Sequence, residues 1–457
     1  MRRPILLTLI LARGLLGAGV ATAQTLTTWE VAELSFTAVQ AHAWADFPVQ
    51  VTFSHAPSGT SLTLDGYWDG GDTWRVRYTL PRAGSWTWHA MSSDAGLQGD
   101  GAVTAVSATA EQRDGNRSYR GHLHVAADGR HFAQADGTPF FYLGDTNWNL
   151  MMSGWDQGGA LCNLGGNFET WVNDRVQKGF TVMQGRYFGL SLWNEGGYPF
   201  PDNAGDTNDW GYLNPAYFQS VDVRLAYLWS RGLVLAAHPD WLIERNVSLT
   251  RAQAISRFLL ARYGAHSIVW SLTGEFQSAI DSGQLQWEAN DWAELRALGT
   301  FVASHNPYGH PVSVHPGGSD EGAPTFGQQS SAHFFHDEPW LDHNWLQTYV
   351  HDDKVAFRVQ EAYAYLPSKP VVESEPCYES YSFTWPWTGF CDAEMARRQA
   401  WTAMLWGAAG HVYGAEGLYY CDDLSALDLA GSTELSYLGS LLRSVDWSRL
   451  VPTTACV

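Results

Sequence analysis

The sequence predicts an α/β protein in which a small immunoglobulin-like β-sandwich precedes a (β/α)8 barrel. Within residues 25–108, short alternating apolar and polar runs are separated by turn residues, which is typical of a sandwich. From residue 122 to residue 452, apolar strand-like runs alternate with helix-like segments eight times, as a parallel barrel requires. A doubly wound sheet is the alternative, but it usually carries a glycine-rich phosphate turn after its first strand, and this chain has none there.

The sandwich prediction depends on period-two alternation between turn signals. In "TWRVRYTL", Trp74, Val76 and Tyr78 share one face of the predicted strand. The turn "DGGD" at 69–72 is rich in aspartate but lacks the ligand spacing of a calcium-binding loop, so we expect a hairpin turn there. The polar segment 109–121 is expected to be a linker.

The barrel prediction depends on eight apolar runs with helical segments between them. One helical segment begins with Asn214 as its N-cap and Pro215 in its first turn. The strand candidates, in chain order, are 139–146, 180–188, 233–239, 267–276, 310–316, 344–350, 369–376 and 411–418.

The first 23 residues have the pattern of a secretory signal peptide. Arg2 and Arg3 precede an apolar run, and Ala21–Ala23 offer a small-residue cleavage site. We therefore expect a secreted or periplasmic protein. No later run reaches the ~18 apolar residues that a membrane span needs.

The net charge of the chain limits the classes of molecule that it can bind. The formal charge is -20, and removal of a leader with three arginines gives -20 - 3 = -23. Such a charge argues against nucleic acid or an anionic membrane surface as a partner.

Of the five cysteines, Cys377 and Cys391 flank one loop and could pair, which leaves an odd number. The 23 tryptophans suit stacking on sugar rings, although core packing explains any single one equally well.

Polar side chains stand where the predicted barrel strands end. Active sites of such barrels lie at the carboxyl ends of the strands. The candidates there are Asp145, Gln184, Arg186, His238, Glu275, His315, Gln347, Glu373, Glu375 and Glu416.

Two of these candidates, Glu275 and Glu375, follow the fourth and seventh strands. These strands stand on opposite sides of a barrel mouth, so the two carboxylates can face each other across a bound substrate. Glycoside hydrolysis requires such a pair, one protonated and one ionised. The alternative is a plain ion pair between either glutamate and Arg186 or Arg262.

Glu375 belongs to the unusual stretch "KPVVESEPCYES", which holds three carboxylates within seven positions. Glu373 lies two residues before Glu375, so we expect it on the same strand face as a substrate-orienting or pKa-tuning neighbour. Glu379 is expected on the following loop. Tyr378 is a further candidate for contact with substrate.

Three other motifs are weighed against simpler explanations. "HFFHDEPW" contains His336 and other possible metal ligands, but its spacing matches no standard zinc or non-haem iron site. A substrate-contacting loop is preferred, and no metal or cofactor is predicted. Trp148 and Trp241 either stack on a sugar or pack against neighbouring loops.

Motifs along nearly all of the chain after the leader resemble known families. "WEVAELSFTA" and "GYWDGGDTWRVRYTLPRAGSWTW" resemble the sandwich module of domain-of-unknown-function family 5060. "ADGTPFFYLGDTNWNL", "RVQKGFTVMQGRYF", "IVWSLTGEF", "FFHDEPWLDHNWLQ", "KPVVESEPCYE" and "WGAAGHVYGAEGL" resemble the apiosidase-like barrel of family 4038, related to glycoside hydrolase family 140.

The resemblance implies a glycosidase acting on plant cell-wall glycans, with apiose as the characterised specificity. It implies an acid/base at Glu275 and a nucleophile at Glu375. Relatives often carry aspartate at the first position, so Glu275 departs from the pattern and the mechanism class stays open. Many relatives continue into a C-terminal β-domain, which we expect to be absent or truncated here.

We therefore expect a secreted hydrolase of pectin-type glycans with retention. A carboxyl separation of ~5.5 Å would indicate retention, and one of ~6.5–9.5 Å inversion. The alternative is an inert carbohydrate-binding or adhesion protein that uses sandwich aromatics such as Tyr67 or Trp68. A peptidase has little support because neither HExxH nor GxSxG occurs. The sugar, the linkage and the oligomeric state are not predicted.

Overall fold

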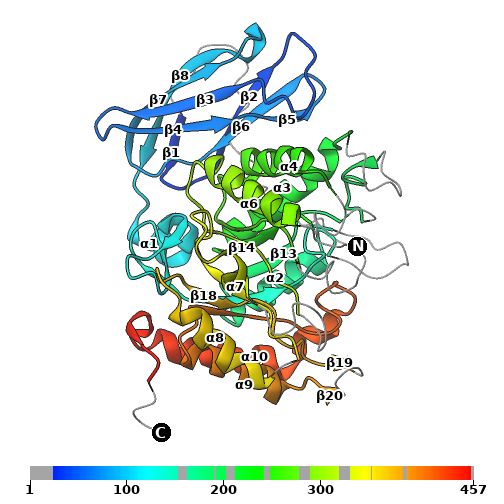
Figure 1. Cartoon of the computed structure of the whole chain (residues 1–457). Coiled ribbons are helices and arrows are strands. Elements are labelled where there is room, and N and C mark those ends of the chain that lie inside the picture. The colour runs from blue at the N-terminus through cyan, green and yellow to red at the C-terminus, as the bar shows by residue number, and fades with distance from the viewer. Residues whose placement is uncertain are drawn as a thin grey trace, which may run out of the picture. The chain divides into compact units, whose positions relative to one another are not determined.

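The computed structural model describes residues 24–152, 162–189, 192–201, 211–240, 247–276, 289–318, 330–350, 352–383 and 389–453 (Figure 1). The predicted leader (1–23), Trp241 and Cys456 lie outside these residues. Contacts between Cα atoms divide the chain into two units. One comprises Met1–Thr109 with Ala261–Ala265, and the other comprises Ala110–Leu260 with His266–Val457.

The N-terminal unit is a β-sandwich, as predicted. A five-stranded sheet has the order β1-β8-β7-β3-β4, and a three-stranded sheet has the order β2-β6-β5. The strands are β1 (Gln24–Thr27), β2 (Ala32–Thr37), β3 (Gln50–His55), β4 (Thr60–Asp65), β5 (Tyr67–Gly70), β6 (Thr73–Tyr78), β7 (Gly84–Met91) and β8 (Gly99–Val106).

Alternation along β6 places its aromatic side chains in the sandwich core. Trp74, Val76 and Tyr78 are buried, as the sequence pattern predicts. The expected hairpin turn joins β5 to β6, where Gly70 and Gly71 have φ angles of 107° and 53°. Glycine reaches this region without the steric cost that a Cβ would bring, so the aspartate-rich stretch serves the turn.

The second unit is built on eight parallel strands in the order β16-β15-β14-β13-β12-β21-β18-β17, a nearly closed barrel (Figure 1). Each strand lies within or overlaps its predicted run, so the predicted fold class is confirmed. The strands are β12 (Tyr142–Thr146), β13 (Val182–Arg186), β14 (Val234–His238), β15 (Ile268–Ser271), β16 (Val312–Ser313), β17 (Asn344–Leu346), β18 (Val371–Glu373) and β21 (Gly410–Tyr413).

Most of the strands are shorter than the predicted runs because the polar residues beyond them leave the regular ladder. The chain nevertheless stays hydrogen-bonded there. The His315 amide donates to the Thr273 carbonyl at 3.3 Å, and the Glu375 amide donates to the Leu346 carbonyl at 3.2 Å. The segments after β15, β16, β17 and β18 are therefore held by backbone bonds.

Helices alternate with the barrel strands. Asn214 caps α3, where its side chain accepts a hydrogen bond from the Ala216 amide at 3.1 Å, and Pro215 occupies the first turn. The helices are α2 (Asn167–Gln177), α3 (Pro215–Ser230), α4 (Leu249–Tyr263), α6 (Ala289–Ser304), α7 (Ser331–Phe335), α8 (Val355–Ala364), α9 (Ala393–Leu405) and α10 (Ala430–Arg443). The predicted linker 109–121 contains α1 (Ala110–Gly115) and the 3-10 turn Arg117–Arg120.

The barrel interior is filled by apolar side chains that point inward from the strands. Tyr142, Val182, Val234, Val269, Trp345, Val372 and Val412 form one buried cluster. A small sheet of β9 (Leu123–Val125), β10 (Phe132–Gln134) and β11 (Pro139–Phe140) adds further side chains to it. Since this sheet directly precedes β12, it lies at the amino ends of the strands, and the packed interior leaves the carboxyl ends for a site.

Two disulfides lie in the barrel unit. Cys377 pairs with Cys391, as expected from the loop that they flank. Cys162 pairs with Cys421 across 259 positions, a pairing that spacing did not indicate. Among the described residues, no helix has the length and apolar character needed to cross a membrane.

Candidate active site

The carboxyl ends of the barrel strands carry one compact cluster of polar and aromatic side chains. Two carboxyl groups, Glu275 and Glu375, belong to it, and the charge of Glu275 acts on Glu375. Around them stand Trp148, His238, His315 and Gln347, at the ends of four further strands, and Tyr378, which follows the same strand as Glu375. The cluster joins residues more than two hundred positions apart, as the closure of a barrel allows.

Glu375 is buried, with 6% of its surface exposed, and it accepts a hydrogen bond from the Tyr378 hydroxyl. The direction of that bond follows from Trp148. An indole N–H can only donate, and Trp148 Nε1 lies 2.9 Å from the Tyr378 oxygen. The Tyr378 oxygen therefore accepts from Trp148, and its proton points to Glu375 Oε1.

The other carboxylate oxygen of Glu375 lies 3.3 Å from Nε2 of His315. Nδ1 of His315 lies 2.8 Å from the Pro316 carbonyl oxygen, which can only accept, so Nδ1 carries the proton of the neutral ring. Burial lowers the pKa of His315 to about 3, so the ring is neutral and Nε2 is an acceptor. A carboxylate facing it would be repelled, whereas a protonated Glu375 can donate to it.

The electrostatics of Glu375 agree with this geometry. Burial, followed by the charge of Glu275, raises the pKa of Glu375 well above its ordinary value, and the hydrogen bond from Tyr378 acts in the opposite direction. Without substrate, burial and the charge of Glu275 therefore favour the protonated form of Glu375. The hydrogen bond from the Tyr378 hydroxyl and, less strongly, one from Trp148 favour the ionised form.

Glu275 has a different environment. It is half-buried, and Gln347 Nε2 donates to its Oε1 at 3.0 Å. Its backbone has φ 39°, in the left-handed region that costs a non-glycine residue about 1 kcal/mol. The backbone on both sides is bonded to His315, whose amide contacts Thr273 and whose carbonyl accepts from Phe276 at 3.4 Å. The strained residue is thus held in place beside the fifth strand.

His238 forms the floor of the cluster. Its ring stacks on Trp345 with centroids 5.2 Å apart and meets the rings of Trp148 and His315 edge-on. Burial, with the neighbouring His315 and Arg186, lowers the pKa of His238 well below its ordinary value. Both histidines are therefore neutral, and they add no charge to the cluster.

Arg186 does not form the plain ion pair that was the alternative for the glutamates. Its guanidinium lies 3.2 Å from Asp240 and also donates to Asn149 and to the Trp148 carbonyl. Arg186 thus holds the segment after β12 in place. Gln184 is buried below the mouth and donates to the Ser374 carbonyl at 2.9 Å, which supports the backbone just before Glu375.

The three carboxylates of the "ESEPCYE" segment lie in three different environments. Glu373 lies in register with Leu346, whose side chain packs in the helix-facing cluster, so Glu373 does not share a face with Glu375. The chain leaves strand geometry after β18, which breaks the alternation. Glu379 accepts hydrogen bonds from the Tyr413 hydroxyl at 2.5 Å and from the Gly431 amide, in the first turn of α10.

Asp145 is not in the cluster, which corrects the prediction that it contacts substrate. Tyr142 points into the barrel, so alternation along β12 turns Asp145 outward. There it accepts from Trp171 Nε1 at 2.8 Å and pairs with Arg175 Nε at 2.5 Å, all three residues being fully buried. Asp145 and Arg175 thus form a structural ion pair between β12 and α2.

His336 also lies elsewhere, which corrects a second prediction. It follows α7, and its Nε2 is 2.8 Å from the Pro367 carbonyl, in the segment before β18. That position is at the amino ends of the strands, because α7 returns the chain to the start of β17. Glu416 follows β21 and lies beside Tyr419 and Asp422. Trp241 is outside the described residues.

Two residues of the site were missed in the sequence. Tyr419 stacks on Tyr378 with centroids 4.9 Å apart, and Tyr420 lies within electrostatic reach of Glu275 and Glu375. The signal that could have found them is "GLYYC", two adjacent tyrosines before a cysteine directly after the last strand.

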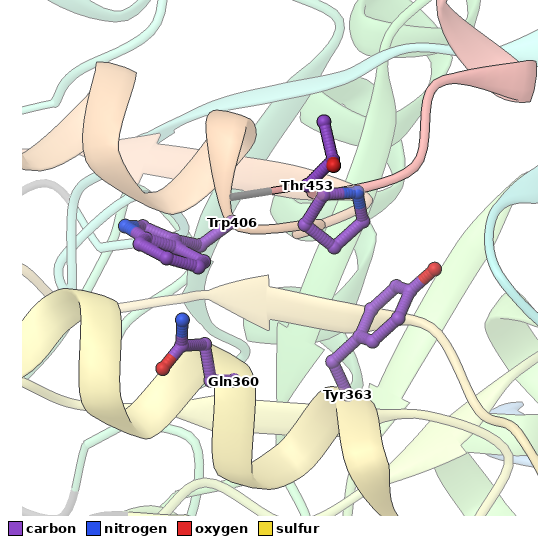
Figure 2. A pocket seen from close by; sticks show the side chains of 5 residues that line it. Gln360, Tyr363, Trp406 and Thr453 are labelled. Atoms are coloured by element: carbon purple, nitrogen blue, oxygen red, sulfur yellow. The ribbon is translucent and has the colours of Figure 1, made fainter. Parts of the chain in front are cut away.

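A separate pocket of about 350 Å³ lies at the other end of the barrel (Figure 2). Gln360, Tyr363 and Trp406 face it from the carboxyl ends of α8 and α9, together with Pro452 and Thr453. The carboxyl ends of these helices lie near the amino ends of the strands. None of the lining residues is ionisable near neutral pH, so the pocket has no acid or base to offer.

The mouth of this barrel holds two carboxyl groups within electrostatic reach of each other and in different environments, among aromatic rings and neutral polar side chains. That combination defines a glycoside hydrolase. The apiosidase-like catalytic domain model matches residues 126–449, so the chain belongs to that family and is a glycoside hydrolase. The Domain of unknown function (DUF5060) model matches residues 25–93.

Several solved structures share the fold of this chain. A candidate glycoside hydrolase from Bacteroides vulgatus ATCC 8482 is 18% identical, with a TM-score of 0.70 over 94% of this chain and 81% of that one. A family 5 glycoside hydrolase from the same organism is 24% identical, with a TM-score of 0.58 over 74% and 75%. A family 5 mannosidase from Rhizomucor miehei is 13% identical, with a TM-score of 0.50 over 72% and 99%. Comparison with curated sequences finds no match.

The alternative of an inert carbohydrate-binding protein is thereby set aside. It relied on exposed sandwich aromatics, but Tyr67 is fully buried and donates to Glu33 at 2.5 Å. Only Trp68 of that pair is partly exposed.

Proposed function

We propose that this glycosidase is exported, cleaves pectin-type plant cell-wall glycans at an apiose-like residue, and retains the anomeric configuration. The observation that carries the mechanism is the interaction of Glu275 with the buried Glu375 across the barrel mouth. The substrate class comes from the apiosidase-like family. Export comes from the leader-like first 23 residues.

In the proposed mechanism, the Glu375 carboxylate attacks the anomeric carbon while the glycosidic C–O bond breaks. Glu275 gives its proton to the leaving oxygen. In the second step, Glu275 takes a proton from water, whose oxygen attacks the same carbon and releases Glu375. Partial exposure suits Glu275 to this role, because an acid/base must exchange protons with solvent between the steps.

The mechanism requires an ionised Glu375 and a protonated Glu275, so a proton on Glu375 in the empty site passes to Glu275 before the attack. The hydrogen bond from Tyr378 favours this, and a positive charge developing on the sugar ring favours it further. The substrate is neutral at the reacting position in this proposal. A formal chain charge of -20 gives no long-range attraction for polyanionic pectin, whereas the neutral His238 and His315 can contact hydroxyl groups.

Chemical rescue by azide tests the two roles separately. If Glu375 is the nucleophile, Glu375→Gly with azide and an activated glycoside yields a glycosyl azide of inverted configuration. Glu275→Gly then yields the azide of retained configuration. Exchanged stereochemical outcomes between the two variants would reverse the two roles.

A substrate screen tests the specificity. Apio-, arabino- and galactofuranosides and the corresponding pyranosides are compared, with Glu375→Gln as the inactive control. Release of apiose, absent in the control, is the expected result. Hydrolysis of another sugar only would contradict the substrate proposal while leaving the two-carboxylate mechanism in place.

A further inference from the structure

The loop that follows β21, residues 417–423, is held at several points beside the glutamate pair. The Trp148 amide donates to the Tyr419 carbonyl at 2.7 Å, and Asn149 Nδ2 donates to the Tyr420 carbonyl at 3.2 Å. The next residue, Cys421, is bonded to Cys162, and Asn147 Nδ2 lies 2.9 Å from the Cys162 sulfur. The loop after the last strand is thus joined to the loop after the first.

This loop brings one aromatic ring against the residue that bonds to Glu375. The Tyr419 ring stacks on Tyr378 with an interplanar angle of 20°. Tyr378 has two polar contacts, one from Trp148 Nε1 and one to Glu375 Oε1. Its hydroxyl can keep both only while the ring stays in its present orientation, and the stacked Tyr419 covers one face of that ring.

We propose that Tyr419 is a positioning residue: by stacking on Tyr378 it keeps the Tyr378 hydroxyl directed at Glu375, and the Cys162–Cys421 disulfide keeps Tyr419 in place. The inference rests on the proposed function, in which Glu375 reacts with the sugar. Tyr419 itself need not touch the substrate.

The consequence concerns the ionisation of Glu375. The Tyr378 hydrogen bond opposes the effects of burial and of Glu275 on that carboxyl group. If Tyr419 is removed, Tyr378 can rotate, and the ionised form loses its principal donor. A hydrogen bond to a charged group has about twice the strength of a neutral one, so partial loss should raise the Glu375 pKa by about one pH unit.

The first test needs no substrate. Infrared difference spectra follow the carboxyl stretch of Glu375 during a pH titration, and the band is assigned by its absence in Glu375→Gln. Tyr419→Ala should raise the midpoint by about one pH unit. Tyr419→Phe, which keeps the ring, should leave it unchanged. The exposed tyrosine of α10 provides the matched control, Tyr437→Ala, which should also leave it unchanged.

Two further variants test the disulfide and guard against misfolding. Cys162→Ala with Cys421→Ala should raise the midpoint in the same direction, since the loop loses its bond to the first strand. Tyr419→Leu keeps much of the side-chain volume but has no flat ring to stack on Tyr378. It takes the place of Tyr419→Ala in the test if that variant does not fold. In activity assays, the acid limb of kcat should move to higher pH by the same amount, with KM changed less than twofold.

An unshifted Glu375 midpoint in folded Tyr419→Ala or Tyr419→Leu would overturn the inference, because a merely structural role lowers stability without moving this titration. The outcome is independent of the catalytic assignment. Turnover by Glu375→Gln would remove the nucleophile from the proposed function, and the infrared result would still decide the role of Tyr419.

Discussion

The environment of Glu373 predicts how much its substitution changes the free energy of unfolding. It lies fully buried in β18, where the Thr348 amide donates to its Oε1 at 3.1 Å, and its Oε2 has no hydrogen-bond partner among the described residues. Burial raises its pKa from 4.5 to about 7, against the hydrogen bonds from Thr348. We predict that Glu373→Gln stabilises the protein at alkaline pH, because the amide resembles the protonated acid.

The sign follows from proton linkage. The folded state binds the Glu373 proton more tightly than the unfolded state does, so stability is fully present below about pH 4.5 and is lost as pH rises to about 7. The pKa difference of 7 - 4.5 = 2.5 corresponds to about 3 kcal/mol of unfolding free energy, at 1.36 kcal/mol for each pKa unit. The free energy of unfolding of Glu373→Gln minus that of the wild type should therefore increase by about 2–3 kcal/mol between pH 5 and pH 8.

Urea denaturation at both pH values measures this difference. The exposed Glu111→Gln on α1 is the control, and its difference from the wild type should stay within about 0.5 kcal/mol at both pH values. A Glu373→Gln difference that is the same at pH 5 and pH 8, or that falls with pH, would refute the reasoning.

Three further outcomes are expected. Asp145→Asn removes the buried carboxylate partner of Arg175 and leaves it paired with Asp174 only among the described residues; this should cost about 3 kcal/mol in urea denaturation, and a wild-type stability would contradict the structural assignment. Because the pKa of Glu375 is well above 4.5, kcat should fall on the acid side well above pH 4.5 if Glu375 reacts as a carboxylate; an acid limb near 4.5 would argue against it. Trp148→Phe removes the donor to Tyr378 and should lower kcat about tenfold with little change in KM, whereas an unchanged kcat would show that Tyr378 holds its orientation without it.

The sequence was sufficient to predict the two-part architecture. Period-two alternation in Trp74, Val76 and Tyr78 predicted a sandwich strand, and eight apolar runs separated by helical patterns predicted the barrel. These signals are local, because burying one face of a strand or one stripe of a helix fixes the spacing of apolar residues. The two candidate carboxylates could be named for the same reason, since a barrel directs the carboxyl ends of its strands to one mouth.

What the sequence could not provide is the orientation of each polar side chain near a strand end. Asp145 and Glu373 stand at strand ends like Glu375, yet one faces α2 and the other faces the layer outside the barrel. In β12, Asp145 stands one position away from the residues that point into the barrel. In β18, the chain stops alternating after Glu373, so Glu375 does not point in the same direction as Glu373. Such shifts depend on long-range backbone bonds, including the one from the Glu375 amide to Leu346.

By itself the sequence determined the fold class, and it predicted the site's place in the fold and its pair of carboxyl groups, because these depend on periodicity and on residue type. Only the tertiary structure decided how burial and neighbouring charge act on Glu375 and which tyrosines lie close to it. Burial, the tautomer of His315 and the Cys162–Cys421 bond arise from segments far apart in the chain, and pKa values depend on the distances at which such segments meet.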